Sequence, residues 1–254
     1  MNLHQRRAVY IVGCGPGDVE LLTIKAYNIL TSAQVLVYTG SLINPDILKL
    51  AKRAEVMLNS ANMSWREILE VLVAGYNQGK LTAWAHDGDP TIYGGLWEVI
   101  LALRENGIPY EIVPGVSSVA ASAARLGVEL TVPYYSQSVI ITRPHGKTPL
   151  RSEERLSQLA KHHSTMVILL GAHAGEAIKN ELLAGNFDLE DHVAVVYHAT
   201  WGDEKKFICR LEELPLKLRE RGVTRSATIV VGPAVEALLG AIKPTTSKVY
   251  GDHK

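Results

Sequence analysis

Residues 8–18, AVYIVGCGPGD, place a short apolar run directly before a glycine-rich turn. The run at 8–12 has the length and β-branched content of a buried strand, and glycines in the turn at 13–18 allow the backbone to reverse sharply. A stretch with helical spacing follows at 23–30, and a second apolar run lies at 34–38. Strand, turn, helix and strand in this order predict an α/β fold with a parallel sheet.

Two further apolar runs of the first half end in the same kind of turn. Residues 81–85 are followed by HDGDP at 86–90, and residues 110–113 are followed by PGVSS at 114–118. Ligands of open parallel sheets bind beyond the carboxyl ends of the strands, where such turns gather. Three turns of this kind therefore favour a binding site over ordinary chain reversals.

The helices of the first half have clear start signals. Asn44 is a predicted N-cap followed by proline, and Ser64 with Glu67 has the spacing of a capping box. Met63 and Ile68 occupy the two positions of a hydrophobic staple around that box. We expect this helix to reach residue 77, and a further helix to cover 96–105.

The second half has its own set of predicted elements. Strands are expected at 139–142, 166–170, 193–197, 206–209 and 228–231, and helices at 153–161, 176–183, 214–220 and 234–239. The predicted organisation is an N-terminal α/β domain at 1–118, a C-terminal α/β domain at 119–243 and a polar tail at 244–254.

Composition limits the possible functions. The chain has 254 residues, of which 26 are Lys or Arg and 26 are Asp or Glu, so bulk positive charge for nucleic-acid binding is absent. No segment approaches the roughly 18 unbroken apolar residues of a membrane span. Cys14 and Cys209 are too few for a disulfide framework and form no CxxC pair for zinc. We expect a cytoplasmic protein without nucleic-acid or membrane partners, in which Cys14 fills a loop.

A dinucleotide-binding fold is the obvious first hypothesis, and two details disfavour it. Asp18 occupies the place of the third glycine of the G-x-G-x-x-G motif, where a carboxylate would repel a pyrophosphate. The second strand ends in Val37, Tyr38, Thr39 and Gly40, without a carboxylate for a ribose hydroxyl. These loops suit an uncharged or cationic nucleoside.

The strings GCGPGD with Leu21, Leu22 and Thr23, then GDPTIYG, then PGVSS resemble the tetrapyrrole methylases, which use S-adenosylmethionine. The resemblance extends from about residue 9 to residue 239. Within the family, YTGSL at 38–42, NMS at 62–64 and HATWGDE at 198–204 resemble the subgroup that methylates carbon 11 of precorrin-4 or cobalt-precorrin-4 in cobalamin biosynthesis.

The resemblance implies a two-domain tetrapyrrole methylase fold, with a largely parallel N-terminal sheet, a mixed C-terminal sheet and flanking helices. It also implies a homodimer with the cofactor, S-adenosyl-L-methionine, between the domains, and S-adenosyl-L-homocysteine as its product. The cofactor residues that it implies are Pro16, Asp87, Gly88, Asp89, Ile92, Ser117, Ser118, Leu170, Ala199, Cys209, Ala227 and Thr228. Two of these depart from the family pattern: Cys209 replaces a usual glycine, and Asp87 replaces a small residue.

A tetrapyrrole substrate carries acetate and propionate groups, which cationic or hydrogen-bonding side chains recognise. The candidates are Arg143, His145 and Lys147 in the loop at 143–149, with His86 and His198 at strand ends, and Met63 and Trp201 as apolar contacts. Since S-adenosylmethionine carries an activated methyl group, orientation is the main catalytic task, and no catalytic residue is assigned. No metal-ligand set is visible, so any cobalt arrives within the substrate.

Three alternatives remain open. Another family methyltransferase would act at a different macrocycle carbon or on a diphthamide precursor. Uroporphyrinogen methylation is disfavoured because Thr39 stands where those relatives have an aspartate. A non-catalytic binder of a nucleoside or tetrapyrrole would bind the cofactor without forming product, and an NAD-dependent oxidoreductase would require the missing ribose carboxylate.

Overall fold

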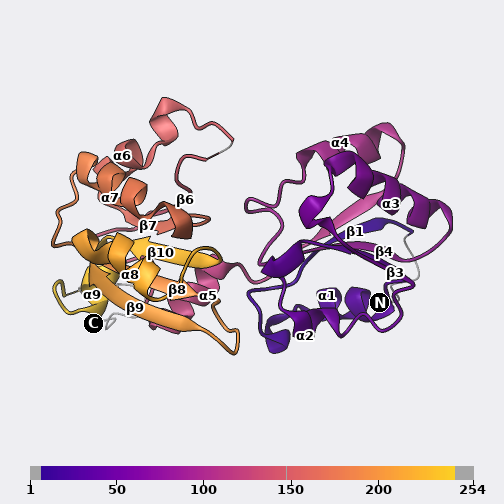
Figure 1. The fold of residues 1–254 in the computed structure, drawn as a ribbon, viewed down its shortest axis with the longest axis horizontal. Helices are drawn as coiled ribbons and strands as arrows, with labels where there is room; N and C mark the ends of the chain where they lie inside the picture. Colours follow the sequence, from indigo (N-terminus) through magenta and orange to yellow (C-terminus); the bar gives the residue numbers. More distant parts are fainter. Residues whose placement is uncertain (1–6, 147, 244–254) are drawn as a thin grey trace, which may run out of the picture. The chain divides into compact units, whose positions relative to one another are not determined.

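The computed structural model describes residues 7–146 and 148–243, so that Lys147 and the predicted tail at 244–254 lie outside the described residues. The chain divides into two compact units, Met1–Ser118 and Val119–Lys254. Each unit contains one five-stranded sheet (Figure 1). The predicted α/β class, with a parallel first sheet and a mixed second sheet, is confirmed.

The first sheet has the strand order β3-β2-β4-β1-β5, and every neighbouring pair is parallel. Its strands are β1 (Val9–Gly13), β2 (Val35–Tyr38), β3 (Val56–Asn59), β4 (Thr82–His86) and β5 (Tyr110–Val113). All residues of β1 and β4 are buried, as expected for central strands of a parallel sheet that is covered on both faces. Because the strands are parallel, their carboxyl ends lie at one edge of the sheet.

Helices cover both faces of this sheet (Figure 1). Helices α1 (Ile24–Ser32) and α2 (Pro45–Leu48) pack over one face, around a core that includes Val12, Ile29 and Leu36. Helices α3 (Trp65–Asn77) and α4 (Trp97–Glu105) pack over the other, around a core that includes Ile11 and Leu72. The first unit is thus a three-layer α/β/α sandwich.

The start signals of two helices act as the sequence predicts. The Asn44 side chain accepts a hydrogen bond from the backbone N–H of Asp46, and Pro45 is the first residue of α2. The Ser64 hydroxyl accepts from the Glu67 N–H, while the Glu67 carboxylate accepts from the Ser64 N–H at 2.7 Å. Met63 packs against the cluster that contains Ile68. The predicted caps are confirmed.

The second sheet has the order β6-β7-β10-β8-β9, in which only the β6–β7 pair is parallel. Its strands are β6 (Val139–Thr142), β7 (Thr165–Ile168), β8 (His192–Tyr197), β9 (Lys205–Arg210) and β10 (Ala227–Val231). The helices are α5 (Ser118–Leu126), α6 (Leu156–Leu159), α7 (Gly175–Ala184), α8 (Leu214–Glu220) and α9 (Pro233–Leu238). One core joins this sheet to α6, α7 and α8.

Seven short 3-10 helices complete the described chain, at Val19–Leu21, Gly40–Leu42, Ser60–Asn62, Ser152–Glu154, Ala160–His162, Ala172–Ala174 and Leu211–Glu213. The predicted single helix at 153–161 is wrong, because Arg155 has an extended backbone with φ −65° and ψ 146°. Glu181 accepts hydrogen bonds there from the Arg155 guanidinium and the Ser157 N–H. The predicted strand at 166–170 ends early at Ile168.

Candidate functional site

The three glycine-containing loops follow three adjacent strands of the first sheet. They leave β4, β1 and β5, which are neighbours in this order, and the parallel pairing puts their carboxyl ends at the same edge. A fourth strand, β2, lies on the other side of β4 and ends at Tyr38. The sheet order therefore gathers the motifs that the sequence separates by about a hundred residues.

Glycines bring the backbones of these three loops into direct contact. A Cβ placed on Gly13 would lie 2.5 Å from the Gly115 nitrogen, and one placed on Gly115 would lie 2.2 Å from the Gly88 carbonyl oxygen. Gly88 itself has φ +55° and exchanges two backbone hydrogen bonds with Gly15, at 2.8 and 3.1 Å. Gly13 and Gly115 have no room for a side chain, because the neighbouring atoms are all main-chain atoms.

Asp89 braces this arrangement. One of its carboxylate oxygens accepts from the Thr91 N–H at 2.8 Å and from the Thr91 hydroxyl at 2.6 Å. The other oxygen accepts from the Gly115 N–H at 3.2 Å, which joins the second loop to the third. The side chain thus holds two loops together, and its predicted contact with a cofactor stays a prediction.

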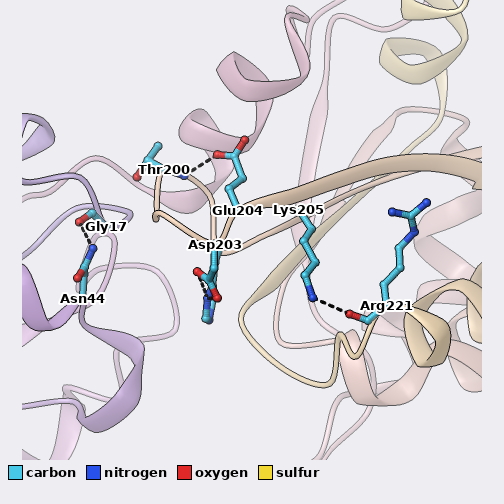
Figure 2. Close-up of polar contacts among 8 residues, drawn as sticks. Gly17, Asn44, Thr200, Asp203, Glu204, Lys205 and Arg221 are labelled. Carbon is cyan, nitrogen blue, oxygen red and sulfur yellow. Dashed lines mark hydrogen bonds and ion pairs between the residues drawn. The ribbon is translucent and has the colours of Figure 1, made fainter.

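The first loop is held from both ends. The Asp18 carboxylate accepts from the Glu20 N–H at 2.9 Å and so caps the short helix at Val19–Leu21. The Asn44 side chain donates to the Gly17 carbonyl at 2.9 Å, as Figure 2 shows, so α2 fixes the loop. Pro16, which precedes these two attachments, is half-buried. Asp18 therefore caps only this short helix, whereas α1, the first long helix after β1, begins at Ile24 with Thr23 as its N-cap.

Asp87 differs from the other loop carboxylates. Its side chain is exposed and accepts a hydrogen bond from the Thr39 hydroxyl at 3.3 Å. Thr39 directly follows the end of β2. Desolvation by the surrounding protein raises the pKa of Asp87, while the bond from Thr39 acts in the opposite direction. The Asp87 side chain is thus accessible to solvent, although nearby protein atoms raise its pKa.

Two buried groups lie next to Asp87. Burial raises the pKa of the Cys14 thiol to about 12, with Asp87 adding to the rise, so this thiol is neutral. This agrees with the predicted role of Cys14 as an inert loop residue. Desolvation lowers the pKa of His86 to about 4, and the side chain is 2% exposed. The His86 imidazole is therefore uncharged at neutral pH, and its predicted contact with the substrate stays a prediction.

The remaining first-unit candidates lie at the same edge. Ser117 and Ser118 are half-buried, and the position of a Cβ on Gly88 is 3.6 Å from the Ser118 nitrogen. Ile92 is half-buried, and its N–H donates to the Asp89 carbonyl at 3.1 Å. Met63 packs in the core under α3 and α4. The structure thus brings the candidates of the three loops together, and puts Met63 in a packing role.

In the second unit, Leu170 has an unusual backbone for a leucine. It follows β7 with φ +56°, and its side chain is 54% exposed. A bulky residue in the left-handed region costs of order 1–3 kcal/mol, and such strain concentrates at functional sites. Leu170 is therefore a strained and exposed apolar residue, and its predicted contact with a cofactor stays a prediction.

The loop after β8 is strained and firmly braced. His198 and Thr200 have φ +48° and +69°. The Glu204 carboxylate accepts from the Thr200 N–H at 2.7 Å, as drawn in Figure 2, and from the Arg125 guanidinium at 2.7 Å. His198 stacks on Trp201 with ring centroids 4.4 Å apart, and Asp203 binds the His198 Nδ1 at 2.9 Å. Trp201 thus has a packing partner.

Four predicted cofactor residues of the second unit have buried side chains, namely Ala199, Cys209, Ala227 and Thr228. Cys209 and Ala227 belong to the main core of the unit, and burial raises the pKa of the Cys209 thiol to about 11. Their predicted contacts with a cofactor stay predictions.

The predicted substrate loop after β6 has its own internal contacts. The Arg143 guanidinium donates to the carbonyls of Pro144 at 3.2 Å and Thr148 at 3.0 Å, which shapes the loop. His145 is exposed. Their roles toward a carboxylate stay predictions.

Sequence reasoning missed the close approach of Gly13 and Gly115 and the hydrogen bond between Thr39 and Asp87. The glycines were visible as strand-end residues, but their contact depends on the sheet order. Among the described residues, no group of three or more His, Cys, Asp or Glu side chains is placed to hold a metal ion. No helix in 7–146 or 148–243 has the length and apolarity needed to cross a bilayer.

Comparison with known proteins gives a consistent match. The family model of the tetrapyrrole (corrin/porphyrin) methylases matches residues 8–215. The chain is 47% identical to a cobalt-precorrin-4 C(11)-methyltransferase of Methanocaldococcus jannaschii, over 91% of this chain and 89% of that protein. It is 39% identical to a precorrin-4 C(11)-methyltransferase of Pseudomonas aeruginosa, over 90% of this chain and 91% of that protein.

Two solved structures of this family are similar to the chain. A cobalt precorrin-4 methyltransferase superposes with a TM-score of 0.86 at 35% identity, covering 91% of this chain and 98% of the other. A uroporphyrin-III C-methyltransferase of Thermus thermophilus, complexed with S-adenosylhomocysteine, superposes with a TM-score of 0.77 at 30% identity, covering 91% and 99%.

Proposed function

This chain belongs to the tetrapyrrole methylase family, and from that premise we propose that it transfers a methyl group from S-adenosylmethionine to carbon 11 of precorrin-4. The cobalt complex of that macrocycle is the form that we favour as substrate. The observation that carries the proposal is the 47% identity over 91% of the chain to a protein named for this reaction.

The three-loop edge of the first unit suits the cofactor. Gly13 and Gly115 let the three strand-end loops pack backbone against backbone, which gathers main-chain groups at the edge where we propose that the nucleoside binds. Asp18 makes the same edge unfavourable for a pyrophosphate. We therefore propose the loop residues Pro16, Gly88, Asp89, Ile92, Ser117 and Ser118, with Leu170, as cofactor contacts.

S-adenosylmethionine, when bound, supplies a methyl group on a sulfonium, which needs no covalent intermediate with the protein. The chain's own task is to orient the macrocycle carbon along the S–CH₃ bond, and correct orientation is worth roughly 7–11 kcal/mol of the barrier. The braced loops serve this task, because Asp89 and Asn44 fix the second, third and first loops by hydrogen bonds. Arg143 and His145 are the proposed partners of the substrate carboxylates.

The proposal extends to assembly, place and metal content. We infer a homodimer that acts in the cytoplasm and holds no metal of its own, so that cobalt enters with the substrate. The family resemblance supports the dimer, and the lack of a candidate metal cluster in the described residues is compatible with the metal inference. Light scattering of the purified protein and its elemental analysis test the dimer and the metal content.

The test of the reaction is a mass spectrum of the products formed from S-adenosylmethionine with enzymatically prepared precorrin-4, with and without cobalt. We expect one added methyl group, with faster conversion of the cobalt form. Conversion of neither form by a protein that binds S-adenosylhomocysteine would overturn the proposal in favour of another family substrate or a non-catalytic binder.

A further inference from the structure

Among the three acidic side chains of the strand-end loops, Asp87 is the one that neither caps a helix nor accepts a hydrogen bond from the backbone of another loop. Asp18 caps a helix and Asp89 accepts hydrogen bonds from Thr91 and from the Gly115 backbone. Asp87 is exposed and accepts one bond from a side chain, the Thr39 hydroxyl at 3.3 Å. It is therefore the loop carboxylate that is available to a bound molecule.

Among the described residues of the neighbouring strand ends, none next to Asp87 carries a positive charge near pH 7. The neighbouring strand end of β1 contributes Cys14, whose pKa is raised to about 12, and β4 contributes His86, whose pKa is lowered to about 4. Both are neutral near pH 7. From the end of β2 comes the uncharged Thr39. Within the described residues no Lys or Arg forms an ion pair with Asp87, and desolvation raises its pKa.

The proposed reaction releases a proton. An electron pair of the macrocycle forms the new C–CH₃ bond, while the electrons of the S–CH₃ bond remain on sulfur, which becomes a neutral thioether. The macrocycle then carries one additional positive charge until a ring proton leaves. An acceptor near the macrocycle lowers the barrier by taking this proton as the bond forms.

We propose that the Asp87 carboxylate accepts the proton that the macrocycle loses on methylation, and that Thr39 positions this carboxylate from the end of β2. The inference rests on the proposed function and adds to it an acid–base group. The carboxylate becomes a carboxylic acid in the step and returns its proton to water after product release. Its exposure provides the route for that return.

The experiment compares the full-length wild-type chain with Asp87→Asn, which keeps the size of the side chain and removes its basicity. Methyl transfer is measured under saturating S-adenosylmethionine as a function of pH, and S-adenosylhomocysteine affinity is measured by calorimetry. We expect kcat to fall by about 10²–10⁴-fold with the affinity little changed. The wild-type rate should decline as pH falls through the raised pKa of Asp87, and this decline should be absent in the variant.

Two further variants make the result specific. Thr39→Val removes a bond that lowers the pKa of Asp87, so the acidic limb of kcat should move to higher pH. Asp188→Asn is the matched control, because Asp188 is exposed in the second unit, outside the loops. It should behave as wild type. Circular dichroism establishes that each variant is folded, and Asp87→Glu should recover part of the rate if the asparagine variant proves unstable.

Three other outcomes would each contradict either the role of Asp87 or the proposed function. An Asp87→Asn variant with wild-type kcat and pH profile overturns the inference while the proposed function stands. A variant that loses activity only in proportion to cofactor affinity assigns Asp87 to cofactor binding instead. A wild-type protein that methylates neither form of the macrocycle overturns the proposed function itself.

Discussion

At the scale of single residues, the site depends on positions that have no side chain. Gly13 and Gly115 are required by close approach of two strand-end backbones, whereas Gly88 also has a left-handed backbone. A methyl group at Gly115 has no flexible neighbour to displace, since it meets a carbonyl oxygen and main-chain carbons. The glycines therefore set how closely the three loops can approach one another.

We expect Gly115→Ala to lower the free energy of unfolding by about 1–3 kcal/mol and to weaken S-adenosylhomocysteine binding, because overpacking forces the loops apart. Denaturant unfolding and calorimetry measure the two effects. The control is Gly202→Ala, where no heavy atom lies within 4 Å of the added carbon. Equal stability of the two variants would show that the loops tolerate separation.

His86 gives a prediction with a defined pH window. The unfolded chain takes up its proton below about pH 6.5, but the folded chain does so only near pH 4, so acid favours unfolding between these values. We expect His86 to lower the free energy of unfolding by about 3 kcal/mol as pH falls from 7 to 4. Subtracting the stability of His86→Gln at each pH isolates this contribution. A difference that stays constant over the window would contradict the buried neutral imidazole.

At the scale of elements, local sequence determined what could be predicted. Helix starts such as Ser64 with Glu67 depend on neighbours three residues apart, so they are visible in the sequence and the structure confirms them. Strand β3 was missed because it is a short edge strand whose side chains are mostly exposed, and backbone pairing with β2 defines it. The break at Arg155 was missed because its partner, Glu181, lies on another helix.

The cap of α3 provides the prediction at this scale. Ser64→Ala removes the hydroxyl that accepts from the Glu67 N–H, and we expect a loss of about 0.5–2 kcal/mol in the free energy of unfolding. Denaturant titration at pH 7 measures it. The control is Thr31→Ala, because the Thr31 hydroxyl near the end of α1 donates to the Tyr27 carbonyl and caps no helix start. A Ser64→Ala variant as stable as this control would show that the cap contributes nothing measurable.

At the scale of the whole molecule, each unit has its own sheet and core. Sheet order could not be predicted from residue patterns, because the neighbours β4, β1 and β5 are far apart in the chain. For the same reason, the contact between Thr39 and Asp87 joins residues that are 48 positions apart. The motifs predicted which loops form the candidate site. The long-range pairing of strands determines which side chains of these loops lie close together.

Ligand preference tests the choice between a nucleoside and a dinucleotide for the whole protein. At about one hundred times its dissociation constant a ligand stabilises the folded state by about 2.7 kcal/mol. For a chain of this size that raises the Tm by roughly 5–10 °C. We expect this shift with S-adenosylhomocysteine and none with NAD⁺, measured by scanning calorimetry. A shift with NAD⁺ alone would contradict the account of Asp18 and the loops.

The position of the transferred methyl group tests the proposed reaction directly. The protein is incubated with cobalt-precorrin-4 and S-adenosylmethionine labelled with ¹³C in its methyl group, and the isolated product is studied by NMR. We expect an enriched methyl carbon bonded to carbon 11 of the macrocycle. Enrichment at any other ring carbon, or an unlabelled macrocycle, would contradict the proposed reaction.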